Sequence, residues 1–379
     1  SSAASDVYKR QIYGRLFQIS TWGESHGKGI GVVIDGCPAG LSLSEEDIQV
    51  YLDRRKPGQS QFTTGRKESD MAQIWSGVFE GRTTGTPISI LVQNQDQRSR
   101  DYGNIMNTYR PGHADYTFDE KYGFRDYRGG GRSSGRETTA RVAAGAVAAK
   151  ILKELGIEVH AYTKAIGPVS VPENEYHPEE IFQNPIYMPS NAYAQKASAY
   201  LEECIKNQDS SGGIIECVVT GMPVGIGDTV FEKLDANLAK AMLSIGAVKG
   251  FEIGDGFKAA DTKGSINNDS FHTKDGRITK DTNHAGGVLG GMSDGSKIIF
   301  RAAVKPTPSI SQPQSTVTKD GDNTEMIIKG RHDPVIVPRA VVVVESMAAI
   351  TILDLLFTNM SARMDKLKSF YGTDVVALF

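Results

Sequence analysis

The chain has 379 residues, carries a formal net charge of −3, and is 39% hydrophobic and 23% charged. This length supplies enough apolar material for a large core, and the near-neutral charge excludes the strong overall basic field typical of nucleic-acid-binding proteins. The three cysteines show no C-x-x-C spacing, which argues against a disulfide framework and a cysteine-ligated zinc site. We therefore expect a globular protein with reduced thiols, located in the cytoplasm.

Two segments of the chain bear on targeting to a membrane or compartment. Residues 1–11 lack an initiator methionine, an apolar stretch and a helical period, so we interpret them as a leader outside the fold. The longest apolar run, residues 341–356, is interrupted by Glu345 and Asp354, and we expect no membrane span. No linker or repeat divides residues 12–379, so we expect a single domain.

Hydrophobic patterns along the chain predict both strands and helices. Alternating or continuous apolar runs indicate strands at 12–21, 30–35, 72–80, 87–93, 157–163, 214–220 and 297–304. Helical periodicity indicates helices at 137–155, 192–207, 230–243 and 340–367, and a capping-box pattern at Ser44 and Asp47 begins a helix that ends near Pro57. The two kinds of element do not alternate strictly, which favours an α+β fold over a doubly wound parallel sheet. We expect a layered β-α-β sandwich, neither a Rossmann fold nor a P-loop fold.

A glycine-rich and arginine-rich loop precedes the helix predicted at 137–155. The sequence "RGGGRSSGRE" (128–137) combines three consecutive glycines, two serines and three arginines. The glycines let the backbone approach a ligand closely, and the start of a helix presents unpaired N–H groups. Such a place binds anions, and arginine forks suit phosphate or carboxylate oxygens. The loop therefore predicts a phosphate site, although a solvated turn or a nucleic-acid contact has a similar composition.

Two familiar nucleotide-binding motifs fail in this loop. Residues 130–135 have the glycine spacing of a P-loop, but Arg136 and Glu137 occupy the places of lysine and of serine or threonine. The Rossmann pattern also fails, because Ser134 stands at the position of its third glycine. The predicted anion site therefore needs another scaffold.

Arginines and histidines recur in other polar loops. Arginines cluster within residues 54–66, 98–110 and 331–339, which suggests a small ligand with several anionic groups. Three histidines lie in loops beside arginines, acids or glycines, where their titration near neutral pH suits proton transfer: His26, His113 and His332. No H-E-x-x-H motif or other metal-ligand spacing is present, so we expect no metal site.

Three longer segments point to a family. They are "GESHGKGIGVVIDGCP" (23–38), "GRSSGRETTARVAAGA" (131–146) and "RHDPVIVPRAVVVVESM" (331–347). They closely resemble the signature blocks of the chorismate synthase family, and the resemblance extends from about residue 13 to about residue 364. It implies a shikimate-pathway lyase that converts 5-enolpyruvylshikimate 3-phosphate to chorismate and phosphate by 1,4-elimination. It also implies reduced FMN as a catalytic cofactor that is not consumed.

The resemblance also implies roles for particular residues. His26 would supply a proton near the leaving phosphate, His113 would stabilise the reduced flavin at its N1 side, and Asp333 would relay the proton collected at N5. Substrate anions would be bound by Arg54, Arg55 and Arg136. FMN would be bound by Arg132, Ser133, Ser134, Gly246, Ala247, Gly290, Lys305, Pro306, Thr307, Pro308, Ser309 and Arg331. Gln61 stands where some relatives carry arginine, so no role is assigned to it.

The resemblance further implies a homotetramer, and we expect an external flavin reductant, with NADPH only as its source. Direct use of NADPH by the enzyme itself stays open on the sequence. Two other function classes stay open on the residues alone. A kinase or phosphatase could use the same arginines without flavin, and a nucleic-acid-binding protein could place the glycine-arginine loops on phosphates. The missing P-loop and metal-ligand patterns count against the first class, and the near-neutral charge counts against the second.

Overall fold

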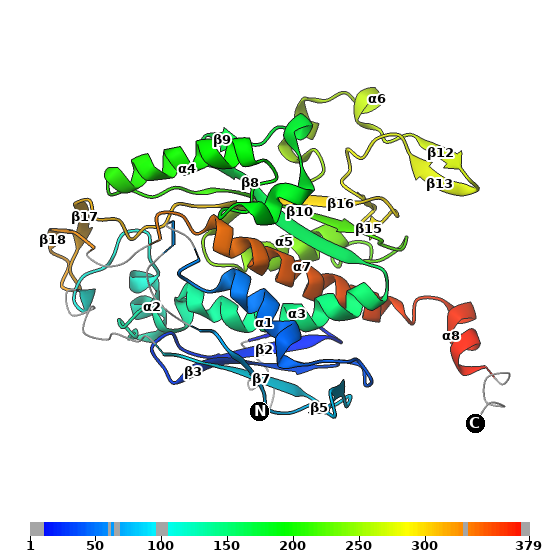
Figure 1. The fold of residues 1–379 in the computed structure, drawn as a ribbon, viewed down its shortest axis with the longest axis horizontal. Helices are drawn as coiled ribbons and strands as arrows, with labels where there is room; N and C mark the ends of the chain where they lie inside the picture. The colour runs from blue at the N-terminus through cyan, green and yellow to red at the C-terminus, as the bar shows by residue number, and fades with distance from the viewer. Residues whose placement is uncertain (1–10, 60–61, 64–68, 96–104, 329–332, 373–379) are drawn as a thin grey trace, which may run out of the picture.

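The structure is a computed structural model that describes residues 11–59, 62–63, 69–95, 105–328 and 333–372. Two five-stranded sheets form its outer layers, and helices fill the space between them (Figure 1). Neighbouring strands in both sheets are antiparallel. The expected α+β fold is therefore confirmed, and its antiparallel pairing differs from the parallel sheet of a Rossmann fold.

The first sheet contains the N-terminal strands. Its order is β1 (Ile12–Tyr13), β2 (Gln18–Gly23), β3 (Gly29–Asp35), β7 (Ile88–Gln93) and β4 (Ala72–Ile74). Ile30, Val32 and Ile34 of the central strand β3 are all buried. Because alternate side chains of a strand point to the same face, these three residues direct one face of the sheet at the helical layer.

The second sheet contains strands from the middle and the later part of the chain. Its order is β11 (Val248–Ile253), β16 (Ile298–Val304), β10 (Gly213–Thr220), β8 (Glu158–Ile166) and β9 (Val169–Ser170). Ile215, Cys217 and Val219 alternate along β10 and are fully buried. They belong to the same hydrophobic core as the buried residues of β3, so one core joins the two sheets through the helices.

Four helices form the middle layer: α1 (Glu45–Arg55), α3 (Thr138–Glu154), α5 (Leu234–Leu243) and α7 (Val337–Asn359). The helices α3 and α7 approach closely where Gly145 faces Ser346, because a Cβ atom on Gly145 would lie 2.2 Å from Ser346 Cβ. By length and composition α7 could cross a membrane, but 83% of its apolar window is buried inside the protein. It is therefore a core helix that lies between two sheets.

The remaining elements lie at the periphery. Figure 1 shows α4 (Asn191–Lys206) over the second sheet, with α2 (Asp115–Tyr122) and α8 (Met364–Tyr371) at opposite ends of the molecule. The short elements are β5 (Val78–Phe79), β6 (Arg82–Thr83), α6 (Gly264–Asn267), β12 (Phe271–Lys274), β13 (Arg277–Lys280), β14 (Val288–Leu289), β15 (Met292–Ser293), β17 (Gln314–Val317) and β18 (Asn323–Met326).

Two predicted strands are interrupted in the structure. The strand predicted at 12–21 is divided into β1 and β2, and Gly14 between them has a φ of 92°. The strand predicted at 72–80 is divided into β4 and β5, and Gly77 between them has a φ of 81°. Both breaks occur at a glycine in the left-handed region, where the extended backbone turns.

Two predicted helices have different bounds. The helix predicted at 230–243 begins only at Leu234, because Val230 has a φ of 63° and cannot continue a right-handed helix. The helix predicted at 340–367 is two helices, α7 and α8, separated by residues 360–363. The sequence prediction also omitted α2 and β11, although α2 has local helix signals in Asp115 of its first turn and in Gly123, whose left-handed conformation ends it.

Candidate active site

The glycine-arginine loop, residues 128–137, is compact and leads directly into α3. Its three consecutive glycines have φ values of 70°, 83° and 51°, which residues with side chains rarely adopt. Two short 3-10 turns follow, η2 (Gly131–Ser133) and η3 (Gly135–Glu137). The Ser133 hydroxyl donates to the carbonyl oxygen of Gly130 at 2.7 Å, which closes the loop on itself.

Arg132 ties this loop to β2. Its guanidinium donates to the carbonyl oxygen of Gly23 at 2.8 Å and to Oγ1 of Thr21 at 2.6 Å. Two residues further on, Ser134 Oγ accepts a hydrogen bond from the backbone N–H of Arg136. The predicted FMN residues 132–134 are therefore held in place by bonds to the first sheet and by bonds within the loop.

His26 packs against the glycine-arginine loop. A Cβ atom on Gly129 would lie 2.1 Å from Cε1 of His26, so glycine is required beside the imidazole ring. The Ser25 hydroxyl donates to the carbonyl oxygen of Gly129 at 3.2 Å and lies 3.1 Å from Nδ1 of His26. Because a hydroxyl has one proton, this arrangement makes Nδ1 of His26 the donor to Ser25. The histidine is thus oriented by the loop that it contacts.

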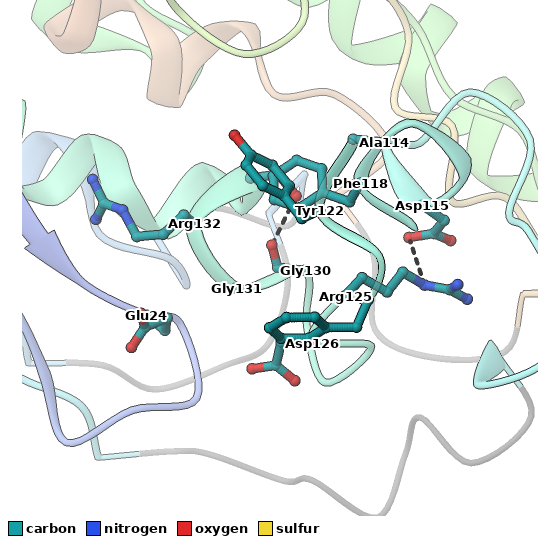
Figure 2. Close-up of a pocket in the computed structure, with 12 residues that line it drawn as sticks. Glu24, Ala114, Asp115, Phe118, Tyr122, Arg125, Asp126, Gly130, Gly131 and Arg132 are labelled. Atoms are coloured by element: carbon teal, nitrogen blue, oxygen red, sulfur yellow. Dashed lines mark hydrogen bonds and ion pairs between the residues drawn. The ribbon is translucent and has the colours of Figure 1, made fainter. Parts of the chain in front are cut away.

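A pocket of about 320 Å³ opens between the glycine-arginine loop and α2 (Figure 2). Phe118, Tyr122 and Phe124 contribute aromatic surface to it, and Arg132 contributes a cation. Its volume lies at the lower end of the range for small-molecule sites. The complete lining is Glu24, Ala114, Asp115, Phe118, Tyr122, Phe124, Arg125, Asp126, Gly130, Gly131, Arg132 and Ser133.

His113 lies just before α2 and is bonded through both ring nitrogens. Its Nδ1 lies 3.0 Å from the carbonyl oxygen of Pro111, which only accepts, so Nδ1 carries the proton. Its Nε2 lies 2.9 Å from Ser309 Oγ and accepts from that hydroxyl when the ring is neutral. Burial, followed by the positive charge of Arg110, lowers the pKa of His113 to about 4. The ring is therefore neutral at physiological pH in the flavin-free protein.

The His113 loop contacts the predicted FMN segment 305–309, which in turn contacts the predicted FMN segment 246–247. Lys305 donates from Nζ to the carbonyl oxygen of Gly112 at 2.7 Å and from its backbone N–H to Ala247 at 2.9 Å. The carbonyl oxygen of Thr307 accepts a hydrogen bond from Ser210 Oγ. The segments 246–247 and 305–309 are therefore adjacent, as the predicted shared site requires.

The His113 loop and the glycine-arginine loop border the same pocket. Ala114 and Asp115, next to His113, line it together with Arg132 and Ser133. Asp115 is buried and accepts two hydrogen bonds from the Arg110 guanidinium, at 2.8 and 2.7 Å. The pKa of Asp115 is lowered because these bonds and the charge of Arg110 outweigh burial, which acts in the opposite direction. This ion pair fixes the start of α2 beside the pocket.

A second group of charged residues surrounds Arg136 of η3 and Arg55 of α1. Arg136 Nη1 contacts Asp70 Oδ1 at 2.5 Å, and Arg55 Nη1 contacts Asp70 Oδ2 at 3.4 Å. Arg339 donates to Asp333 Oδ2 at 2.6 Å and to the carbonyl oxygen of Arg55 at 3.1 Å. Burial, followed by the charge of Arg339, lowers the pKa of Arg55 to about 9, so Arg55 remains a cation at neutral pH.

This charged group is joined to the His26 loop through Asn94. The side-chain oxygen of Asn94 accepts from Arg136 Nε at 2.9 Å. Its amide nitrogen donates to the carbonyl oxygens of Glu24 and Gly27, at 3.0 and 2.9 Å. The arginines predicted to bind substrate anions, Arg55 and Arg136, therefore belong to the same assembly of loops as His26.

Some predicted residues lie elsewhere or outside the described chain. Arg54 makes a bidentate ion pair with the buried Glu345 of α7, at 2.6 and 3.0 Å.

Gly290 lies near the start of α5, because the backbone N–H of Leu234, the first residue of α5, donates to the carbonyl oxygen of Gly291. Residues 246–247 instead follow the end of α5. Ten helical residues span about 15 Å, so these two predicted FMN contacts are well separated. Arg331, His332 and Gln61 lie outside the described residues.

Three residues of the assembly were not predicted from the sequence: Asp70, Asn94 and Arg339. Arg339 lies inside the third family segment, which was a usable signal. Asp70 and Asn94 are single polar residues in loops, and no local pattern distinguishes them from surface residues. Among the described residues, no cluster of three or more His, Cys, Asp or Glu side chains could hold a metal ion.

Comparison with known proteins agrees with the three sequence segments. The chorismate synthase family model matches residues 17–357. The chorismate synthase of Agathobacter rectalis is 66% identical over 359 residues, covering 95% of this chain and 98% of that protein. The chorismate synthase of Lachnospira eligens is 66% identical over 360 residues, with coverage of 95% and 98%.

A solved structure supports the same assignment at the level of the fold. The structure described as "Crystal Structure of Chorismate Synthase" is 32% identical to this chain and superposes with a TM-score of 0.73. The match covers 94% of this chain and 96% of that chain. The chain therefore belongs to the chorismate synthase family, and the protein is an enzyme of that family, a lyase of the shikimate pathway.

Proposed function

We propose that the enzyme converts 5-enolpyruvylshikimate 3-phosphate to chorismate and inorganic phosphate, with reduced FMN as a cofactor that is not consumed. One observation carries the proposal: residues beside His113 line the same pocket as Arg132 and Ser133, whose loop packs on His26. Residues close to the two candidate histidines, Glu24 in one segment and Ala114 and Asp115 in the other, thus border one small-molecule pocket together with the glycine-arginine loop. This arrangement suits a reaction in which a phosphate leaves and a proton is removed.

The residues present fit a flavin nucleotide. The aromatic side chains of Phe118, Tyr122 and Phe124 suit a flat ring system, and Arg132 with the N–H groups of residues 130–132 suits a phosphate. Lys305 and Ser309 extend this set through their contacts with the His113 loop. When bound, reduced FMN supplies electron density to the substrate as the phosphate leaves and regains it when the proton departs.

The arginines fit the substrate, which carries two carboxylates and a phosphate. Arg136 and Arg55 are held as cations around Asp70, and we assign them to the substrate's anionic groups. Arg54 is already bonded to Glu345, so we assign it a smaller part in substrate binding. Fixed cations at the leaving group stabilise the charge that develops on phosphate as its C–O bond breaks.

His26 is the proposed proton donor to the leaving phosphate. Its Nδ1 donates to Ser25 Oγ, so Nε2 is the nitrogen that gains and loses the catalytic proton. The contact with Gly129 keeps the ring beside the anion-binding loop. General acid assistance of this kind typically contributes about 10²–10⁴-fold to the rate.

His113 and Asp333 are the other proposed catalytic residues. A negative charge in the pocket would raise the pKa of His113 from its low value, so His113 would take up a proton as the reduced cofactor binds. The resulting imidazolium of His113 would stabilise that negative charge. Asp333, whose Oδ2 accepts from Arg339, would carry the proton away from the site.

Three further features complete the proposal. The flavin is reduced by an external reductant, with NADPH only as the source of electrons. The active form is a homotetramer, and the enzyme acts in the cytoplasm. The homotetramer is what the family resemblance implies, whereas the external reductant and the cytoplasmic location are expectations from the sequence.

An anaerobic assay tests the proposal. Protein, FMN and 5-enolpyruvylshikimate 3-phosphate are mixed with and without dithionite, and chorismate absorbance is followed. We expect chorismate only in the reduced sample. Equal chorismate without reduced flavin would contradict the role of the cofactor, and release of phosphate without chorismate would favour a phosphatase. No product in either sample would contradict the proposal.

A further inference from the structure

The carboxylate of Asp70 lies between the two arginines assigned to the substrate. Its Oδ1 contacts Arg136 Nη1 at 2.5 Å and its Oδ2 contacts Arg55 Nη1 at 3.4 Å. Asp70 is 0% exposed and Arg55 is 3% exposed. One carboxylate shared by two guanidinium groups leaves one positive charge among the three side chains, which favours an anion nearby.

The backbone of Asp70 is fixed in an uncommon conformation. Its φ is 48°, in the left-handed region that only a small share of residues other than glycine occupy. Gln49 of α1 holds the turn on both sides, because Nε2 donates to Asp70 O at 3.3 Å and Oε1 accepts from Ala72 N at 3.0 Å. Such local strain persists where the surrounding structure enforces it, commonly at functional sites.

The two arginines are also held from their other sides. Arg55 donates to Thr138 Oγ1 at 3.2 Å and to Gly135 O at 2.7 Å. Arg136 donates from Nε to Asn94 Oδ1. Within the part of the chain that the structure describes, Asp70 is the one side chain seen to contact both guanidinium groups, and it sets their position relative to each other.

We propose that Asp70 is a positioning residue, which holds Arg55 and Arg136 in the relative geometry that binds the substrate's anionic groups. The inference rests on the proposed function. Asp70 itself does not touch the substrate in this account. Misplacing binding groups by about 1 Å can lower activity about 10²-fold, so loss of this carboxylate should be visible in substrate kinetics.

Asp70→Asn tests the proposal with little change in shape. Asn adopts the left-handed conformation as readily as Asp, so the turn is retained while the negative charge is removed. We expect kcat/KM for 5-enolpyruvylshikimate 3-phosphate to fall about 10²-fold per folded enzyme, with the larger share in KM. The dissociation constant for FMN should stay within about twofold of that of the wild type.

The matched control is Glu216→Gln on β10. Glu216 is also buried and also pairs with an arginine, Arg301, but it lies in the second sheet away from the loops of the site. This variant should lose thermal stability while KM stays unchanged. If Asp70→Asn also lost thermal stability while its KM stayed unchanged, Asp70 would contribute only to stability, and the proposal would be overturned.

A second variant keeps the test decisive if Asp70→Asn does not fold. Gln49→Met removes the side-chain bonds that hold the Asp70 turn and leaves both arginines and the carboxylate in place. We expect a several-fold rise in KM, and an unchanged KM in the folded variant would overturn the proposal. A wild-type enzyme that forms no chorismate would contradict the proposed function, whereas active wild type with unaltered variants would contradict only the role of Asp70.

Discussion

His113 and Ser309 are 196 positions apart in the sequence, yet His113 Nε2 lies 2.9 Å from Ser309 Oγ. The carbonyl oxygen of Pro111 fixes the proton of the neutral ring on Nδ1, so Ser309 donates to Nε2. This pair joins the loop before α2 to the segment after β16. It gives the proposed flavin site a neutral imidazole that can become a cation when a negative charge arrives.

Replacing His113 should affect the reduced flavin more than the oxidised flavin. In His113→Ala, oxidised FMN should bind nearly as in the wild type, while the midpoint potential and turnover both fall. The direction follows from linkage, because a group that favours the reduced form raises the potential and its removal lowers it. Each tenfold loss in relative affinity for the two-electron-reduced form lowers the potential by about 30 mV.

Flavin titrations in both redox states, together with thermal melts, measure this effect. His160→Ala is a suitable control, because His160 is an exposed histidine on β8 bonded to Glu158. It should leave the potential unchanged. A stable, inactive His113→Ala protein with a normal potential would exclude the flavin-stabilising role.

The low pKa of His113 predicts an acid-sensitive stability in the absence of flavin. Burial and Arg110 lower its pKa from 6.5 to about 4 in the folded protein. Between these values the unfolded chain binds a proton that the folded protein does not, so the free energy of unfolding falls as pH decreases below about 6.5. Above that range neither state is protonated, and the effect disappears.

Urea unfolding of the wild type and of His113→Gln at pH 7.5 and 5.5 measures this contribution. The wild type should lose about 1 kcal/mol more than the variant between the two pH values. Other titrating groups affect both proteins alike and cancel in the difference. Equal losses in the two proteins would mean that His113 is not held neutral by its surroundings.

The glycine-arginine loop should be needed for flavin binding. Arg132→Ala removes a cation at the pocket and the bonds from the loop to Gly23 and Thr21. A charge-assisted contact contributes about 1.5–3 kcal/mol, so FMN affinity should fall about ten- to a hundredfold. The circular dichroism spectrum should remain native.

Arg128→Ala is the matched control for this change. Arg128 lies in the same loop, but its side chain is 54% exposed and pairs with Asp126. Fluorescence titration should give this variant the wild-type FMN affinity. If Arg132→Ala also bound FMN as the wild type does, the loop would serve a different ligand.

Arg54 should contribute more to stability than to substrate binding. Arg54→Met leaves Glu345 buried without its cation, which typically costs about 3–5 kcal/mol. Adding Glu345→Gln should restore much of the loss, because the amide oxygen can still accept from Ala161 N. Urea unfolding and KM per folded enzyme separate the two roles, and a raised KM at normal stability would instead support direct substrate binding.

The sequence predicted those parts of the fold that have a local pattern. The alternation of Ile30, Val32 and Ile34 indicated β3, and the alanine-rich period after Glu137 indicated α3. The breaks at Gly14 and Val230 were missed, because hydrophobic spacing does not report a change in the sign of φ. The helix α2 was missed although Gly123 ends it in a left-handed conformation, because its eight residues are too few for a clear apolar period.

The sequence predicted which loops form the candidate site, but not which side chains pair with its arginines. The loops that bear His26, His113 and Arg132 were identified from motifs, and the structure brings their segments to one pocket. The different surroundings of Arg54 and Arg55 were not predictable, although the two residues are adjacent. Arg54 pairs with Glu345, which lies far away in the sequence. Arg55 pairs with Asp70, which lies in a loop that has no recognisable sequence pattern.

The number of chorismate molecules formed per reduced flavin tests the central claim most directly. Enzyme with a limiting, known amount of FMN is reduced anaerobically, excess reductant is removed, and substrate is added in large excess. Because the reduced flavin would regain the electron density that it gives to the substrate, we predict many chorismate molecules per flavin, with the flavin still reduced at the end. One chorismate per flavin, with the flavin oxidised, would contradict the account.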